Sequence, residues 1–209
     1  RRPIMVRYGN DRGARPHSGV SQAVLVFEDV MDAWWITRLT AVYLQNEPAQ
    51  AGPVRSARPV NVELLPAFDG VLVFSGASIG VNQLLAQHNF NLIHEGSNGD
   101  LFYRSSERKS PHNLYTSVAD VRGRMAALGW EHPVDLRGFS FSPEPPAGQP
   151  VSRIDIPYPK TSTVAWTWDG AAGVFRRWVQ GESYTDLNTG EQVGCENVVI
   201  LYAKNWESD

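Results

Sequence analysis

Two segments near the start of the chain place apolar residues at every second position, the spacing of a β-strand. In residues 21–30 both sides of the alternation carry apolar residues, which predicts a strand buried on both faces. Residues 36–45 alternate in the same way. The connection between the two is too short for a crossover, so we expect an antiparallel pair. A register centred on Ala33 would set Glu28 directly opposite Arg38, close enough for a charged cross-strand contact.

The segment from residue 59 to residue 129 contains three predicted helices and one predicted strand. Residues 59–68 space their apolar positions as a helix does and begin with a proline, which is favourable in a first turn. The short apolar run at 70–76 is bounded by glycines and predicts a buried strand. Ser78 is expected to cap a second helix, and Ser117 a third that ends at Gly129. The first 130 residues therefore combine α and β structure.

The pattern changes at residues 142–150, which hold four prolines and a glycine and predict a linker. Beyond the linker no helix is predicted, and strand-like segments alternate with turn signals such as Asp169-Gly170. The sequence thus predicts a mixed α/β N-terminal domain over 1–141, the linker, and a β-rich C-terminal domain over 151–209. The predicted strands of this last domain are SRIDIPY, TVAWTWDG, GVFRRWVQG and CENVVILYA.

The last predicted strand ends close to residue 209, so we expect the C-terminal sheet to be cut short. An open sheet edge pairs readily with another strand. Self-association through this edge is therefore one expected partner interaction, and a purely structural assembly module is one candidate role.

Composition narrows the classes of function. The 209 residues carry a formal net charge of −3 and have a pI near 6.0, which argues against a general nucleic-acid or membrane-surface binder. The single cysteine, Cys195, excludes an intrachain disulfide and is expected to be an inert, partly buried thiol. The spacing of His88 and His94 fits no zinc motif, and neither a phosphate-binding loop nor a complete dinucleotide fingerprint is present, so we expect no metal and no cofactor.

The stretch GPVRSARP at 52–59 presents Arg55 and Arg58 on a segment stiffened by two prolines just before a predicted helix. Guanidinium groups at such a position suit a carboxylate or a phosphate, which they can bind through two parallel hydrogen bonds. The alternative is that the arginines pair with acidic side chains of the same chain and lock a loop. The sequence leaves both interpretations open.

A second polar stretch, at 102–117, gathers basic and polar residues before the helix capped by Ser117. His112 beside Asn113 is a candidate acid or base, and Ser56 is a candidate nucleophile. No serine-hydrolase motif accompanies them, and a structural histidine bonded to backbone is the favoured alternative. The other candidates in this stretch are Arg104, Arg108, Lys109, Tyr115 and Thr116.

Aromatic and acidic residues around the first two strands give a weaker signal. Trp34 and Trp35 fit either a stacking wall or the core. Glu28, Asp29 and Asp32 include the types that glycoside hydrolases pair, but the sequence does not fix the separation of their carboxyl groups.

Several motifs occur in order: RPIMVRYGNDRGARPHSGVSQAVLVFED, ITRLTAVY, GPVRSARP, SSERKSPHNLYTS, and later WTWDGAAGVFRRWVQGESYTDLNTGEQVGCENVVILY. Together they resemble the YerB-type lipoproteins of bacteria, the family defined by the domain of unknown function DUF3048. The resemblance implies an α+β sandwich with a β-rich C-terminal part, and an extracytoplasmic protein anchored through a lipidated cysteine upstream of Arg1. It assigns no biochemical role to the matching residues, which are Glu28, Thr37, Arg38, Arg55, Ser56, Arg58, Pro59, Arg108, Lys109, His112, Asn113, Tyr115 and Thr116.

Two functional hypotheses follow besides the assembly module. The first is a non-enzymatic envelope domain that binds an anionic ligand, such as a cell-wall glycan or a peptide carboxylate, in an arginine-rich cleft. The second is an envelope hydrolase or transferase that uses His112 as acid or base and Ser56 as nucleophile. The expected ligand-binding residues of the first are Glu28, Arg38, Arg55, Ser56, Arg58, Arg108, Lys109, His112, Asn113 and Tyr115.

Overall fold

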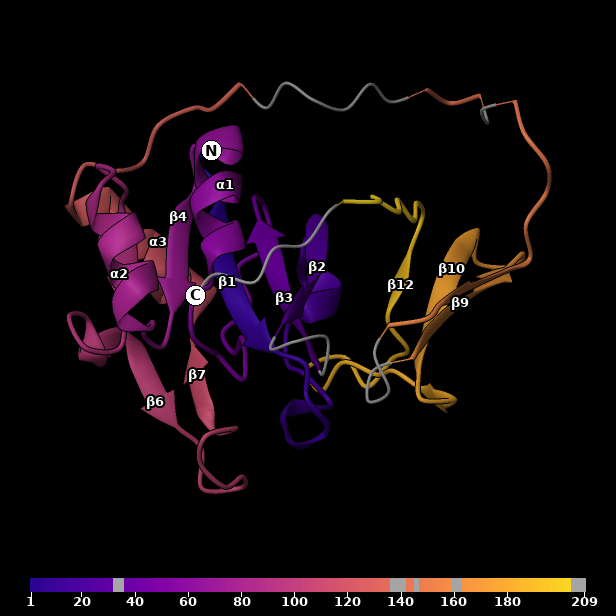
Figure 1. Ribbon diagram of the computed structural model, residues 1–209, viewed down its shortest axis with the longest axis horizontal. Helices are drawn as coiled ribbons and strands as arrows, with labels where there is room; N and C mark the ends of the chain where they lie inside the picture. Colours follow the sequence, from indigo (N-terminus) through magenta and orange to yellow (C-terminus); the bar gives the residue numbers. More distant parts are fainter. Residues whose placement is uncertain (32–35, 136–141, 145–146, 159–162, 204–209) are drawn as a thin grey trace.

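The computed structural model describes residues 1–31, 36–135, 142–144, 147–158 and 163–203. It is a mixed α/β structure, as predicted, built on a central sheet with a second sheet beside it (Figure 1). The predicted tryptophan wall of Trp34 and Trp35, and the carboxylate of Asp32, lie outside the described residues.

The central sheet has five strands in the order β2-β3-β1-β4-β5. β3 is antiparallel to both of its neighbours, β2 and β1, whereas β1, β4 and β5 run parallel. The antiparallel pairing of β2 with β3 and the buried strand β4 are confirmed, and the central strand β1 was not predicted. The strands are β1 (Ile4–Gly9), β2 (Leu25–Met31), β3 (Ile36–Tyr43), β4 (Val71–Phe74) and β5 (Leu92–His94).

The three predicted helices are confirmed, and so are Ser78 and Ser117 as the capping residues of the second and third. Ser78 Oγ accepts a hydrogen bond from Val81 N–H at 3.4 Å, and Ser117 Oγ accepts one from Asp120 N–H at 3.1 Å. Gly129 adopts a φ of 69°, the left-handed conformation that ends a helix at little cost only for glycine. Within the described residues, no helix combines the length and apolar character needed to span a bilayer. The α-helices are α1 (Pro59–Phe68), α2 (Ile79–Ala86) and α3 (Val118–Ala127), and 3-10 turns lie at Arg12–Ala14, Val20–Gln22 and Gly99–Leu101.

The two faces of the central sheet are covered by different elements, because alternate residues of each strand point to opposite sides. Met5, Val42 and Leu72 lie on one face and pack against α1 and α2. Ile4 and Val6 lie on the other face and pack with α3 and the C-terminal part of the chain. The sheet is therefore the middle layer of the molecule (Figure 1).

Two details of β2 differ from the prediction. The strand is not buried on both faces: it lies at the edge of the sheet, and Val26 is 36% exposed. The predicted register is wrong by one residue, because Asp29 rather than Glu28 stands opposite Arg38. Since a shift of one residue moves a side chain to the other face, Glu28 and Arg38 lie on opposite sides of the sheet.

The second sheet joins the core of the first. It has the order β11-β10-β9-β8, with β12 also paired to β10. Val164, Val179 and Tyr184 bury their side chains in the cluster formed by α3 and the central sheet. Asp186 is fully buried and accepts hydrogen bonds from Gly19 N–H and Ser21 N–H at 2.9 and 2.8 Å. The strands are β8 (Arg153–Ile156), β9 (Val164–Asp169), β10 (Val174–Val179), β11 (Glu182–Ser183) and β12 (Gly194–Cys195), and a separate hairpin joins β6 (Phe102–Arg104) to β7 (Leu114–Thr116).

The last predicted strand, CENVVILYA, ends in the structure at Cys195, so its prediction is wrong for the residues that follow. Residues 197–203 form no strand, although Val199 and Ile200 are β-branched. Among the described residues no strand pairs with this segment. Their apolar side chains are accordingly exposed, Tyr202 by 97%.

Candidate functional site

A polar cluster lies where β1 ends. Asp11 follows β1 by two residues, and Arg38 stands beside the last residue of that strand. The segment that carries Arg55 runs along the end of β1, because Arg55 N–H donates to Arg7 O at 2.8 Å. Ser75 N–H, just after β4, donates to Arg55 O at 3.1 Å. The carboxyl ends of parallel strands are a common place for ligand sites in α/β sheets.

Four side chains form this cluster, which we call the arginine cluster: Asp11, Arg38, Arg55 and His112. Arg38 Nη1 donates to Asp11 Oδ2 at 3.3 Å. His112 Nδ1 lies 3.1 Å from Asp11 Oδ1 and 3.3 Å from Arg55 Nη1. One carboxylate and one imidazole thus connect two guanidinium groups that come from distant parts of the chain.

The arginine cluster has an excess of positive charge. Burial, and after it the neighbouring Arg55, lowers the pKa of Arg38 to about 10, while Asp11 opposes the shift. Arg38 still carries its charge at neutral pH. Burial also lowers the pKa of His112, against the effect of Asp11, and the nearby arginines lower it further. His112 is therefore neutral at pH 7, and Asp11, which contacts Arg38 but not Arg55, is the one carboxylate of the arginine cluster.

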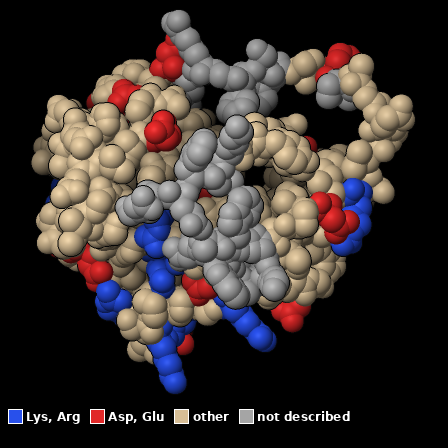
Figure 2. All heavy atoms as spheres, viewed as in Figure 1, with Lys and Arg blue, Asp and Glu red and all other residues tan. Residues whose placement is uncertain are grey.

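Both arginines keep unused hydrogen-bonding capacity. Arg38 is only 3% exposed, and its Nε is buried without a partner among the described residues. Arg55 contacts no described carboxylate, since Nη1 meets only the carbonyl oxygen of Pro111 at 3.2 Å and the ring of His112. Figure 2 shows basic side chains gathered toward the lower part of the face, on the side where Figure 1 places the β6–β7 hairpin. These features favour an anion as the missing partner.

The structure uses three of the other predicted residues to hold loops in place. Arg108 donates to three backbone carbonyls of residues 13–16, at 2.7 to 3.3 Å. Asn113 accepts from Arg104 Nη1 at 2.9 Å and donates to a backbone carbonyl. Tyr115 is 1% exposed and stacks on Tyr103. Arg108 nevertheless contributes to the site, because the segment that it holds leads directly from Asp11.

Glu28 does not join the arginine cluster. It lies on the opposite face of the sheet and accepts hydrogen bonds from Asn10 and Thr37, at 3.0 and 2.7 Å. Arg177 of β10 donates to its second carboxylate oxygen at 2.8 Å. Since the Glu28 side chain is only 9% exposed, the structure makes it part of the contact between the two sheets. Asp29, the next residue, is bound by Arg7 through two hydrogen bonds of 2.5 and 2.7 Å.

The remaining predicted residues surround the cluster without entering its hydrogen bonds. Ser56 is half-buried beside Arg55, and no hydrogen bond joins it to His112 in the described part of the chain. Arg58 precedes α1 and lowers the pKa of Arg38 through its charge. Lys109 is exposed.

Sequence reasoning missed Asp11, which contacts two of the other three members of the cluster, Arg38 and His112. Asp11 comes two residues after the end of a strand, a position that would have marked it as a candidate. The strand, β1, was not recognised from the sequence. His17 was missed for the same reason: it is fully buried between Gly9 and Tyr184, a partner more than 160 residues away.

Comparisons with known proteins agree with this architecture. The model of the DUF3048 N-terminal domain matches residues 1–131, and that of the DUF3048 C-terminal domain matches residues 154–209. The chain belongs to the DUF3048 family. Both models describe proteins of unknown function, so membership in DUF3048 assigns no activity to the arginine cluster.

Two relatives within DUF3048 are similar along almost the whole chain. A protein of Bacillus subtilis strain 168 named "Putative lipoprotein YerB" is 33% identical over 213 residues, which cover 98% of this chain and 63% of the relative. The crystal structure of YerB from Bacillus subtilis matches with a TM-score of 0.80 and 31% identity, over 93% of this chain and 66% of that one. The chain therefore spans somewhat less than two thirds of the length of these relatives.

Proposed function

We propose that this protein is an extracytoplasmic envelope domain that binds an anionic group, a carboxylate or a phosphate, at the arginine cluster. The observation that carries the proposal is the state of its two guanidinium groups. Arg55 has no carboxylate partner among the described residues, and Arg38 is buried with an unpaired Nε and shares one carboxylate with His112. A bound oxyanion would supply the negative charge and the acceptors that this arrangement lacks.

The roles of the four side chains differ. Arg55 is half-buried and would make the direct contact, since its planar fork can donate two parallel hydrogen bonds to an oxyanion. Asp11 holds Arg38 and His112 in place. Neutral His112 adds a donor or an acceptor according to its tautomer, without adding charge. The buried charge of Arg38 would strengthen the field at the site, because few water molecules screen it.

The envelope location is part of the proposal and is supported by the relative named a lipoprotein. An anionic group on a cell-wall peptide or glycan is the ligand that such a location makes available. The alternative of a hydrolase that uses Ser56 and His112 has less support, because Nδ1 of His112 faces Asp11 and Arg55 rather than a hydroxyl group.

The proposal is tested by calorimetric titration of the 209-residue chain with two probes, inorganic phosphate and N-acetylmuramyl dipeptide. The two probes distinguish a general phosphate site from a site for peptide carboxylates. Arg55→Ala is expected to weaken binding of the preferred probe by about tenfold or more, the usual effect of removing a charged hydrogen-bond donor. Its melting temperature should stay close to that of the wild type, since Arg55 has no carboxylate partner to lose.

Arg104→Ala is the matched control. Arg104 is an exposed arginine of the neighbouring hairpin whose Nη2 donates to Glu95 at 2.7 and 3.0 Å. Its removal eliminates a positive charge of the same kind outside the cluster and is expected to leave affinity unchanged. If the wild type binds neither probe, or if Arg55→Ala and Arg104→Ala weaken binding equally, the arginine cluster is not an anion site.

A further inference from the structure

A hollow of about 300 Å³ lies on the outer face of the second sheet. Its position follows from the strand register. Val164 and Val179 point into the core, so the alternation of the strands turns Ala165 and Trp178 to the outer side. Ala165 stands between Trp178 of β10 and Asp155 of β8 in one cross-strand row. A small residue between two large ones leaves a notch in the surface.

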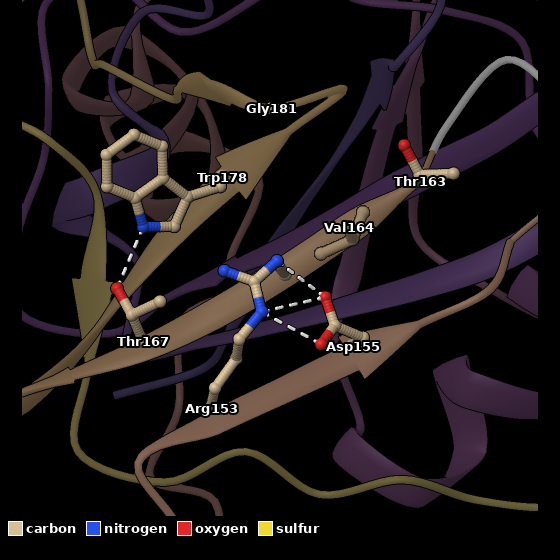
Figure 3. A pocket seen from close by; sticks show the side chains of 8 residues that line it. Arg153, Asp155, Thr163, Val164, Thr167, Trp178 and Gly181 are labelled. Carbon is tan, nitrogen blue, oxygen red and sulfur yellow. Dashed lines mark hydrogen bonds and ion pairs between the residues drawn. The ribbon is translucent and has the colours of Figure 1, made fainter.

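The walls of this hollow are chemically different. On one side Trp178 Nε1 donates to Thr167 Oγ1 at 2.8 Å, which fixes the indole ring against the sheet. On the other side Arg153 binds Asp155 through Nε and Nη2, at 2.7 to 3.1 Å (Figure 3). The hydroxyl group of Thr163 stands at a further point of the rim.

The polar wall is exposed and has no net charge. The side chains of Arg153 and Asp155 are 56% and 65% exposed, and their opposite charges cancel. Arg153 Nη1 has no hydrogen-bond acceptor among the described residues, and Figure 3 shows it on the side of the guanidinium that faces Trp178. The hollow therefore offers free donors and acceptors beside an aromatic ring. Such a surface suits an uncharged ligand that is apolar on one face and carries hydroxyl groups at its edge.

We propose that this hollow binds a neutral saccharide. A pyranose ring has a face of C–H groups that can lie on the indole of Trp178, and its neighbouring hydroxyl groups both donate and accept hydrogen bonds. The Arg153–Asp155 pair provides a donor and an acceptor side by side, the arrangement that a pair of vicinal hydroxyl groups requires. A volume of about 300 Å³ is at the lower end of the range for small-molecule sites. The hollow lies on a different sheet from the arginine cluster and does not depend on the proposed anion site.

The test is a titration of the 209-residue chain with three uncharged tetrasaccharides: chitotetraose, cellotetraose and maltotetraose, followed by calorimetry and by tryptophan fluorescence. We expect at least one of them to bind with a dissociation constant in the millimolar range or below. Trp178→Ala is expected to weaken that binding by about tenfold or more, as is usual when an aromatic anchor is removed. Trp168→Ala is the matched control, because Trp168 is 45% exposed and lies on the opposite face of the same strands.

A second variant keeps the test decisive if Trp178→Ala does not fold. Asp155→Asn alters a side chain that is 65% exposed, so the fold is not at risk, and it is expected to weaken binding by about tenfold. Binding that survives in Arg55→Ala would separate this hollow from the arginine cluster. The proposal is overturned if no tetrasaccharide binds the folded wild type, or if Trp168→Ala weakens binding as much as the variants of the hollow do.

Discussion

Replacing His17 with glutamine is expected to reduce the acid sensitivity of the fold. His17 is fully buried, its Nε2 lies 2.5 Å from Gly9 O, and its Nδ1 contacts the hydroxyl group of Tyr184. A carbonyl oxygen can only accept, so Nε2 carries a proton and donates to Gly9 O. Because the lowered pKa of His17 keeps the ring neutral at pH 7, Nδ1 has no proton and accepts from the hydroxyl group of Tyr184. Burial lowers the pKa of His17 to about 3; the bond to Gly9 opposes this shift, and nearby arginines, Arg177 first, add to it.

The sign and the size of the effect follow from this lowered pKa. Below pH 6.5 the unfolded chain binds a proton at His17 that the folded protein does not, so the free energy of unfolding falls as the pH falls. The slope for one such group is about 1.4 kcal/mol per pH unit. Between pH 6.5 and pH 5 the contribution of His17 is therefore a loss of about 2 kcal/mol, and the loss continues down to about pH 3.

Urea denaturation at pH 7 and at pH 5 measures this difference. In His17→Gln the loss of stability between the two pH values should be smaller than in the wild type by about 2 kcal/mol. His88→Gln is the control, because His88 is exposed and stacks only on Phe90. If His17→Gln retains the full pH dependence of the wild type, His17 is not a buried neutral histidine that holds the C-terminal part in place.

Two further predictions concern the buried Glu28–Arg177 pair and the partly buried Cys195, which no proposed site uses. Glu28→Gln leaves the guanidinium of Arg177 buried without its carboxylate and should cost about 3–5 kcal/mol in urea denaturation, whereas an unchanged stability would show that the pair does not hold the sheets together. Burial raises the pKa of Cys195 to about 11, so its reaction with a disulfide reagent at pH 8 should be on the order of a hundredfold slower in the folded protein than in 6 M guanidinium. Equal rates in the two conditions would contradict this burial.

The helices and strands that were predicted correctly are determined by residues close together in the sequence. The helices capped by Ser78 and Ser117 depend on a side chain that bonds the backbone three residues on. β1 was missed because Arg7 interrupts its apolar run, and nothing local shows that this charge is neutralised. Its partner, Asp29, comes from the far edge of the sheet. A buried arginine is compatible with a central strand only through such a distant contact.

The sequence indicated which types of residue form the candidate site, but it did not indicate which individual residues come together there. The stiff segment with Arg55, and His112 in the second polar stretch, both point to the same place in the structure. Which side chains join them depends on register, and a difference of one residue sends Glu28 to the opposite face. Asp11 became recognisable only with β1, since its role follows from where that strand ends.

Neighbouring residues of two strands serve different faces of the central sheet. On β2, Glu28 binds Arg177 of the second sheet, whereas Asp29 binds Arg7 on the face of the arginine cluster. On β3, Thr37 and Arg38 likewise point to opposite faces of the sheet, since Thr37 donates to Glu28 and Arg38 donates to Asp11. The network that docks the C-terminal part and the one that orients the candidate anion site are thus built on the same two strands. A displacement of either strand would disturb both networks, because a strand moves its two faces together.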